Sequence, residues 1–214
     1  MRFITFSRFF LILSFPLLIF LVVSNFASFD RNFYKKEFSN LNVLQNVPNA
    51  PVLHEKVINF IHGKNSELPS AFNYREKQHL QDVRKVVLVS RNLLFNLIIA
   101  SLMLLLISAS SIKKIYLKDF IGRVLVFGAL LTLTLAGILF LLISSNFSST
   151  FEAFHELFFK RGTFMFDPSS ELIVNLYPEQ LFMDLGIKIS IYIVILSVVI
   201  MLAGICLLYK KQKE

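Results

Sequence analysis

Cysteine and tryptophan are nearly missing from this chain: Cys206 is the single cysteine among 214 residues, and there is no tryptophan. One cysteine excludes a disulfide framework and a thiolate metal cluster. Because Cys206 lies in an apolar stretch, we interpret it as a packing residue. Three catalytic patterns are also absent, namely Gly-x-Ser-x-Gly, His-Glu-x-x-His and paired acidic residues within an apolar stretch. The sequence therefore gives no support to a serine hydrolase, a zinc protease or a proton-driven transporter.

Charge is scarce as well, since only 17% of residues are charged and 55% are hydrophobic. A soluble domain usually has about 45–50% apolar residues, so the surplus indicates a membrane protein. A helix needs roughly 20 apolar residues to span the hydrocarbon core, and its backbone polar groups must pair internally. Four stretches qualify, at about 6–25, 87–110, 123–145 and 185–208. We predict a single all-α integral membrane domain over 1–214, built as a four-helix transmembrane bundle.

Basic residues near the ends of these stretches predict the orientation, because short cytoplasmic segments are enriched in Lys and Arg. Such residues precede the first stretch, fill the short link between the second and third, and end the chain. Both termini should therefore be cytoplasmic in the cell membrane, with the loops at about 26–86 and 146–184 outside. Alternatively, the first stretch is a cleaved signal peptide, which leaves the rest of the topology unchanged. The net charge of +8 comes largely from these flanks and needs no nucleic-acid partner.

Both outer loops contain patterns of short amphipathic helices. The pattern at 52–62 in the first loop predicts one such helix. The polar segment from Tyr74 has no helix breaker, so the second spanning helix should extend outward as a stalk. In the second loop, apolar residues recur at helical spacing from Phe151 to Phe159, as in a helix lying in the headgroup region. Asp167 followed by Pro168 should cap a further helix at 169–176.

Histidines on the outer loops are the natural candidates for proton transfer near neutral pH. His79 has Glu76 and Asp82 three residues away on either side, and each could orient the imidazole. His155 lies within the phenylalanine-rich face beside Glu156, where loss of hydration should lower its pKa. The remaining two histidines are interpreted as ordinary surface residues of a solvated helix: His54 and His62.

The second loop resembles that of the lipoprotein intramolecular transacylases, the Lit family. The resemblance rests on segments 154–159 (FHELFF), 162–164 (GTF), 166–168 (FDP) and 176–179 (LYPE), with Phe182. Segments 75–83 (REKQHLQDV) and 33–38 (FYKKEF) are similar to two further patterns of that family. They occur in the expected order, so the likeness covers nearly the whole chain. Phe164 departs from the pattern, since the family is expected to have an indole there.

The resemblance implies an acyltransferase that moves the sn-2 acyl chain of a bacterial lipoprotein's diacylglyceryl group to the α-amine of the same N-terminal cysteine. The product is a lyso-form lipoprotein. The resemblance also implies that His79 and His155 are the catalytic pair, at the outer leaflet. The partners would be membrane lipids and the diacylated lipoprotein; no cofactor and no metal are expected.

The chemistry fits the residues at hand. An α-amine has a pKa of about 7.7–8.0, so a base must free it to attack the ester. We assign His155 as the base and His79 as the acid, although the two roles could be exchanged, and Arg161 as a candidate for stabilising the oxyanion. Two alternatives stay open. One is a non-enzymatic lipid-binding accessory protein, and the other is a metal site formed by His79 and His155.

Overall fold

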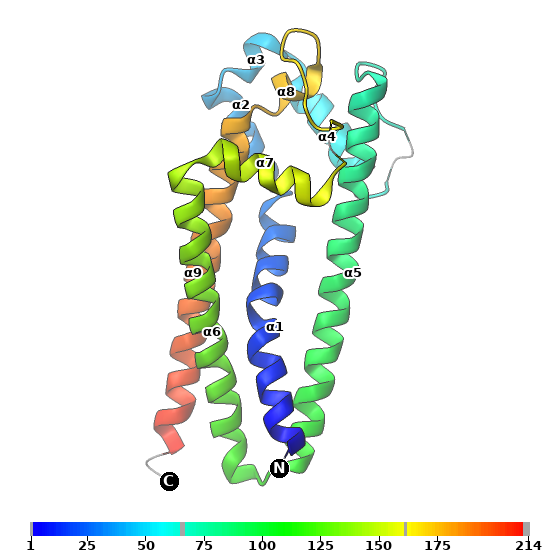
Figure 1. Cartoon of the computed structure of the whole chain (residues 1–214). Helices are drawn as coiled ribbons and strands as arrows, with labels where there is room; N and C mark the ends of the chain where they lie inside the picture. The colour runs from blue at the N-terminus through cyan, green and yellow to red at the C-terminus, as the bar shows by residue number, and fades with distance from the viewer. Residues whose placement is uncertain (1, 65–66, 161, 212–214) are drawn as a thin grey trace. The chain divides into compact units, whose positions relative to one another are not determined.

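The structure, a computed structural model, describes residues 2–64, 67–160 and 162–211. Within these ranges the regular structure is helical, as Figure 1 shows. The helices in chain order are α1 (Arg2–Ala27), α2 (Arg31–Asn40), α3 (Val43–Asn46), α4 (Ala50–Ile61), α5 (Tyr74–Ser111), α6 (Lys114–Ser145), α7 (Phe147–Phe158), α8 (Leu172–Leu176) and α9 (Glu179–Lys211).

Helices α1, α5, α6 and α9 are long and apolar enough to cross a membrane. The predicted fold class, an all-α membrane protein with four spanning helices and short helices in its two loops, is confirmed. The chain divides into two compact units. We call Met1–Asn25, Arg91–Leu141 and Lys188–Glu214 the membrane unit, and Phe26–Ser90 and Leu142–Ile187 the loop unit.

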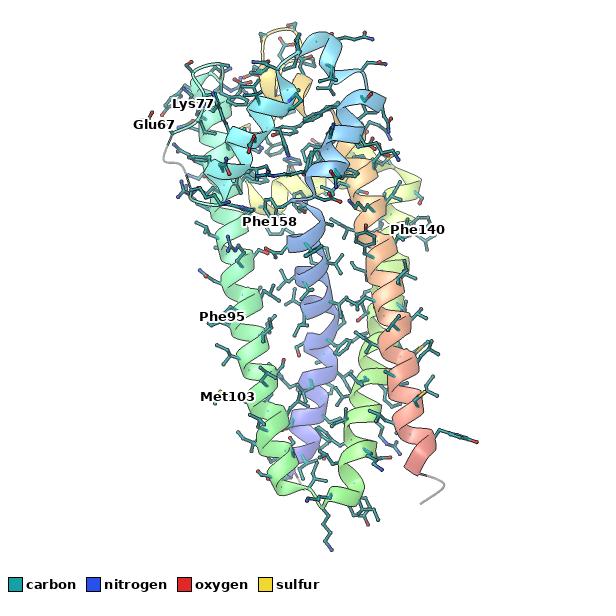
Figure 2. The ribbon with its side chains drawn as sticks, turned by 180° about the vertical axis from the view of Figure 1, so that it is seen from behind. Glu67, Lys77, Phe95, Met103, Phe140 and Phe158 are labelled. Atoms are coloured by element: carbon teal, nitrogen blue, oxygen red, sulfur yellow. The ribbon has the colours of Figure 1, made fainter. Side chains whose placement is uncertain are left out.

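In the membrane unit, two glycines bring α6 and α9 into backbone contact. A Cβ atom added to Gly122 would lie 3.1 Å from the carbonyl oxygen of Gly204, and one added to Gly204 would lie 3.0 Å from that of Gly122. Small residues at such crossings are typical of helices packed in lipid. Large apolar side chains project from the outside of this unit, for example Phe95, Met103 and Phe140 (Figure 2). Such a surface suits a hydrocarbon environment.

The loop unit has its own hydrophobic core. Helices α2, α3, α4 and α8 gather there (Figure 1). Its most deeply buried side chains include Phe38, Phe72, Leu176 and Leu181. The amphipathic helix predicted at 52–62 corresponds to α4, which buries Val57 and Ile61 in this core. Leu80, the neighbour of His79 on α5, belongs to this core.

Helix α5 runs without interruption from its polar first turns into its apolar part, as predicted for a stalk. Its start is a reciprocal capping box. Asn73 Oδ1 accepts a hydrogen bond of 2.9 Å from the Glu76 N–H, and Glu76 Oε2 accepts one of 2.6 Å from the Asn73 N–H. These bonds satisfy amide groups that a helix start otherwise leaves without partners. They fix where the polar end of α5 begins.

The prediction of a helix at 169–176 capped by Asp167 is wrong in its starting point. Helix α8 begins at Leu172, after Glu171. The side chain of Asp167 instead closes a turn, because its Oδ1 accepts hydrogen bonds from the N–H and the hydroxyl of Ser169. Aspartate often forms such turns in competition with helix capping.

The interpretation of His54 as a solvated residue is also wrong. His54 is buried at 6% exposure, with Nδ1 3.0 Å from the Tyr177 hydroxyl and its ring 4.1 Å from that of Tyr34. It lies three residues before Val57 on the apolar face of α4, so helical periodicity explains the burial. Burial, and then the charge of Arg31, lower the pKa of His54 to about 4. His62 lies half-buried against the ring of Phe29, 4.2 Å away.

Candidate active site

His79 and His155 come together within the loop unit, although they are far apart in the sequence. Their imidazole rings stack with centroids 6.0 Å apart and planes 19° apart. His79 comes from the polar start of α5, before its apolar stretch, and His155 from the last turn of α7. The resemblance implied that these two histidines form a pair, and their rings lie next to each other in the structure.

His79 is enclosed by aromatic rings. It is only 7% exposed, and the rings of Phe159 and Phe166 lie 4.9 and 5.3 Å from it. Its Nδ1 is buried and has no hydrogen-bond partner among the described residues. Burial, and then His155, lower the pKa of His79 to about 4, while Asp82 acts in the opposite direction. The imidazole is therefore neutral at pH 7.

His155 has a defined tautomer. Helix α7 starts at Asn146, whose side chain accepts a hydrogen bond of 3.0 Å from the Ser149 N–H. One turn before the histidine, the Phe151 carbonyl oxygen lies 2.7 Å from His155 Nδ1. A carbonyl only accepts, so Nδ1 carries the proton and Nε2 of the neutral ring carries the lone pair. Nε2 can therefore act as a base.

Phenylalanines also surround His155. The rings of Phe151, Phe154 and Phe164 have centroids 4.2, 5.7 and 5.1 Å from the imidazole. Partial burial lowers the pKa of His155, and the hydrogen bond to the Phe151 carbonyl opposes this shift. The phenylalanine face predicted for α7 thus surrounds the histidine. It supplies an apolar setting in which the uncharged imidazole is favoured.

Glu76 does not hydrogen-bond His79 among the described residues, although it was expected to orient the imidazole. It is 1% exposed, and both carboxylate oxygens accept backbone N–H groups, Oε2 that of Asn73 and Oε1 that of Ile173 at 2.7 Å. A buried carboxylate needs such partners, and backbone amides are strong ones. Glu76 therefore joins the start of α5 to the start of α8.

The other expected supporting residues have different positions. The Asp82 carboxylate accepts a hydrogen bond of 2.8 Å from Lys85 and reaches His79 through its charge. Glu156 is exposed on α7. Arg161, the candidate for oxyanion stabilisation, lies outside the described residues. Among the carboxylates proposed from the sequence, Asp82 acts on an imidazole of the pair through its charge, since it raises the pKa of His79.

Glu171 and Arg75 were not among the site residues predicted from the sequence. Glu171 is 5% exposed and accepts hydrogen bonds from Asn73 Nδ2 at 3.3 Å and from the Asp167 N–H at 2.7 Å. Arg75 Nη2 donates to the Met165 carbonyl at 2.7 Å. These contacts join α5 to the loop before α8. The spacing from Asn73 to Glu76 predicts a capping box, but no local pattern predicts a partner so distant in the chain.

Two neutral imidazoles in apolar surroundings can accept and donate protons near pH 7. A metal site on the pair would need further ligands. Within the part of the chain that the structure describes, no group of three or more His, Cys, Asp or Glu residues is arranged to hold a metal ion. The arrangement is suited to acid–base chemistry on a bound molecule.

Known proteins resemble this chain in sequence and in fold. The family model for the lipoprotein intramolecular transacylase Lit matches residues 9–182. The solved structure of the membrane-integral lipoprotein intramolecular transacylase Lit from Bacillus cereus covers 100% of this chain and 99% of that chain, with a TM-score of 0.85 at 19% identity. Two structures of the same protein, with one histidine replaced by arginine or alanine, have TM-scores of 0.80 and 0.81 at 20% identity. The match to the arginine variant covers 99% of this chain and 95% of that chain, and the match to the alanine variant covers 100% and 97%. No curated protein matches.

Fold and site together define a multi-pass membrane protein with a histidine pair in its loop unit. The structural likeness supports the fold, and the family match extends over most of the sequence. The chain belongs to the lipoprotein intramolecular transacylase (Lit) family.

Proposed function

We propose that this chain moves the sn-2 acyl chain of a diacylated bacterial lipoprotein onto the α-amine of the same N-terminal cysteine, giving the lyso form. The observation that carries the proposal is the pair of stacked, neutral imidazoles of His79 and His155. Family membership supports the acyl-transfer class, and the imidazoles supply the acid–base groups that such a transfer needs.

His155 is the base in this mechanism, because its Nδ1 proton is bound to the Phe151 carbonyl and Nε2 is left to accept a proton. Nε2 takes a proton from the α-amine, whose nitrogen then attacks the sn-2 ester carbonyl. The carbon–oxygen bond to the glyceryl group breaks. His79 gives a proton to the departing glyceryl oxygen, and transfer of the amine-derived proton between the two rings restores both neutral histidines.

No protein nucleophile is needed, because amine and ester belong to one substrate molecule. Aligned groups of this kind can have effective molarities of about 10⁵–10⁸ M, which removes much of the barrier. The protein then has to hold the bent substrate and manage protons. The apolar rings around the histidines suit the acyl chains and favour the neutral form of both imidazoles.

The proposed topology has both termini in the cytoplasm and the histidine pair at the outer leaflet. The basic residues in the short segments support this orientation. Single cysteines introduced into a Cys206→Ser background test it. We expect Lys36→Cys and Glu152→Cys to react with an impermeant maleimide in intact cells, and Lys113→Cys to react only after lysis. Labelling of Lys113→Cys in intact cells would reverse the orientation.

Expression in a bacterium whose lipoproteins remain diacylated tests the function. Because intramolecular transfer leaves the total mass unchanged, N-terminal lipopeptides must be fragmented by tandem mass spectrometry to locate the acyl chain. We expect N-acylated, lyso-form peptide from the parent chain. His79→Ala and His155→Ala should each lower its rate by about 10²–10⁴-fold, the usual range for one acid or base.

His62→Ala is the matched control, because His62 lies in the same unit, packs on Phe29 and is separate from the pair. It should keep the parental rate. Full activity in both histidine variants, together with loss of activity in Phe158→Ala, would favour the accessory-protein alternative. A parent chain that yields no N-acylated peptide would refute the transacylase assignment.

A further inference from the structure

One segment of the second loop covers both histidines. We call residues 162–171 the strap. Its Phe164 ring lies 5.1 Å from His155, and its Phe166 ring lies 5.3 Å from His79. The strap therefore supplies one aromatic ring for each imidazole. The strap lies between α7 and α8, and its bonds to the start of α5 are made by the side chains of Arg75, Asn73 and Glu171.

Arg75 holds the middle of the strap. Its Nη2 donates a hydrogen bond of 2.7 Å to the Met165 carbonyl, and its guanidinium lies 5.7 Å from the centre of the Phe166 ring. Arg75 belongs to the first turn of α5, one turn before His79. The ring over His79 is thereby tied to the helix that carries His79.

Glu171 closes the strap at its other end. Its Oε2 accepts the Asp167 N–H at 2.7 Å, which fixes the strap immediately after Phe166. Its Oε1 accepts from Asn73 Nδ2 at 3.3 Å and lies 3.7 Å from Arg75 Nη1. One carboxylate, almost completely buried, thus connects the strap with the cap of α5 and with Arg75. Charge-assisted bonds of this kind are about twice as strong as neutral ones.

Glu76 extends the same connection. Its Oε1 accepts the Ile173 N–H at 2.7 Å, two residues beyond the strap, while Oε2 accepts the Asn73 N–H. Two buried carboxylates therefore join the start of α5 to the strap and to the residues after it. Among the described residues, neither carboxylate is hydrogen-bonded to an imidazole. Both therefore act by holding neighbouring segments in place.

The proposed reaction makes the exclusion of water necessary, and this inference rests on that function. An imidazole that accepts a proton from an amine can equally accept one from water. In the desired transfer, the amine nitrogen bonds to the acyl carbon, the bond to the glyceryl oxygen breaks, and that oxygen gains a proton. In hydrolysis, the water oxygen bonds to the same carbon, the same bond breaks, and a free fatty acid leaves.

We propose that Glu171 is a positioning residue that keeps the strap over the histidine pair, so that the acyl group goes to the tethered amine and not to water. The tether gives the amine its advantage, and the strap keeps water from competing for the same base. Glu76 has the same effect from the α8 side. Weakening Glu171 changes the ratio of products, whereas a purely structural residue would lower both products together.

The test measures that ratio in purified full-length protein with a diacylated lipopeptide in water enriched in oxygen-18. Hydrolysis places one heavy oxygen in the released fatty acid, and transfer to the amine places none in the N-acyl product. In Glu171→Ala we expect labelled fatty acid to rise at least about tenfold relative to N-acyl product, as for the loss of one charge-assisted hydrogen bond. Glu171→Gln keeps an acceptor for the Asp167 N–H and should fall between Glu171→Ala and the parent.

Phe166→Ala is the second variant, because it removes the ring over His79 while leaving the Glu171 contacts in place. It should also raise the ratio. Glu55→Gln is the matched control, since this exposed carboxylate contacts Arg31 in the same unit, and its ratio should equal the parental one. Parental ratios in both Glu171→Ala and Phe166→Ala would overturn the proposal while leaving the transacylase assignment intact. Absence of N-acyl product from the parent would instead overturn the assignment, and the present inference with it.

Discussion

The imidazole planes of His79 and His155 lie within 19° of each other, and within the described residues neither ring is hydrogen-bonded to a carboxylate. A histidine–carboxylate pair would favour the imidazolium. Here the Phe151 carbonyl fixes the proton of His155, and burial lowers the pKa of both rings. The site therefore holds two neutral imidazoles next to each other, and this has a direct consequence for the dependence of activity on pH.

The rate below saturation should show no inflection near pH 6.5, where ordinary histidines titrate. The pKa of His79 is lowered to about 4, so that ring stays neutral as the pH falls through 6.5, and the pKa of His155 is lowered by burial, so any inflection from it lies below 6.5. The rate should instead rise with pH through the range in which the substrate amine loses its proton, about 7.7–8.0. Initial rates of N-acyl formation between pH 5 and pH 9 check this. An inflection at 6.5 that disappears in His155→Asn would contradict it.

The spanning helices could be predicted from the sequence, because runs of Leu, Ile, Val and Phe of this length have few other structures open to them. His79 and His155 could be predicted as candidates from their neighbours and from the resemblance. The capping error at Asp167 has a local cause. Aspartate is common both at helix starts and in turns, so the residue type alone does not decide between the two. Here the Asp167 side chain accepts from Ser169, and the Asp167 N–H donates to Glu171.

The contacts of Glu171 that fix the strap could not be predicted in the same way. Glu171 and Asn73 are nearly a hundred positions apart, and each alone is an ordinary polar loop residue. Burial of Glu171 becomes evident only when α5 and the loop meet. His54 is a different case, because its spacing from Val57 on α4 indicated the buried face, but the residue type suggested the surface.

Replacing Gly204 by alanine should destabilise the membrane unit by about 1–3 kcal/mol, the usual cost of overpacking. The new Cβ would lie 2.9 Å from Val126 Cγ2 and 3.0 Å from the Gly122 carbonyl oxygen, and a backbone atom cannot swing away. Gly137→Ala is the control, since nothing lies within 4 Å of its added Cβ. It should be neutral or stabilise by up to about 1 kcal/mol, because alanine favours helix. Thermal unfolding in detergent, followed by circular dichroism, compares the two variants.

His54 should make the loop unit sensitive to acid. Its pKa is about 4 in the folded chain and near 6.5 when unfolded, so between these values the unfolded chain binds the extra proton. The contribution is fully present above pH 6.5 and is lost as the pH falls toward 4, by up to roughly 3 kcal/mol. His54→Gln cannot titrate and can still bond to the Tyr177 hydroxyl. Scanning calorimetry from pH 7 to pH 4 should show a smaller fall in melting temperature for His54→Gln than for the parent. Equal falls would contradict the prediction.

Glu76→Ala and Asp82→Asn should differ sharply in stability, although the sequence places both carboxylates three residues from His79. Glu76 is buried, and its two oxygens accept the amides of Asn73 and Ile173. Its removal leaves both amides without their partners, at a cost of about 2–4 kcal/mol. Asp82 pairs with the exposed Lys85, and such a surface pair contributes about 0–1 kcal/mol. Urea unfolding of the two variants in the same detergent measures the difference. A Glu76→Ala chain as stable as the parent would mean that the start of α5 and the segment leading into α8 are held by contacts other than this carboxylate.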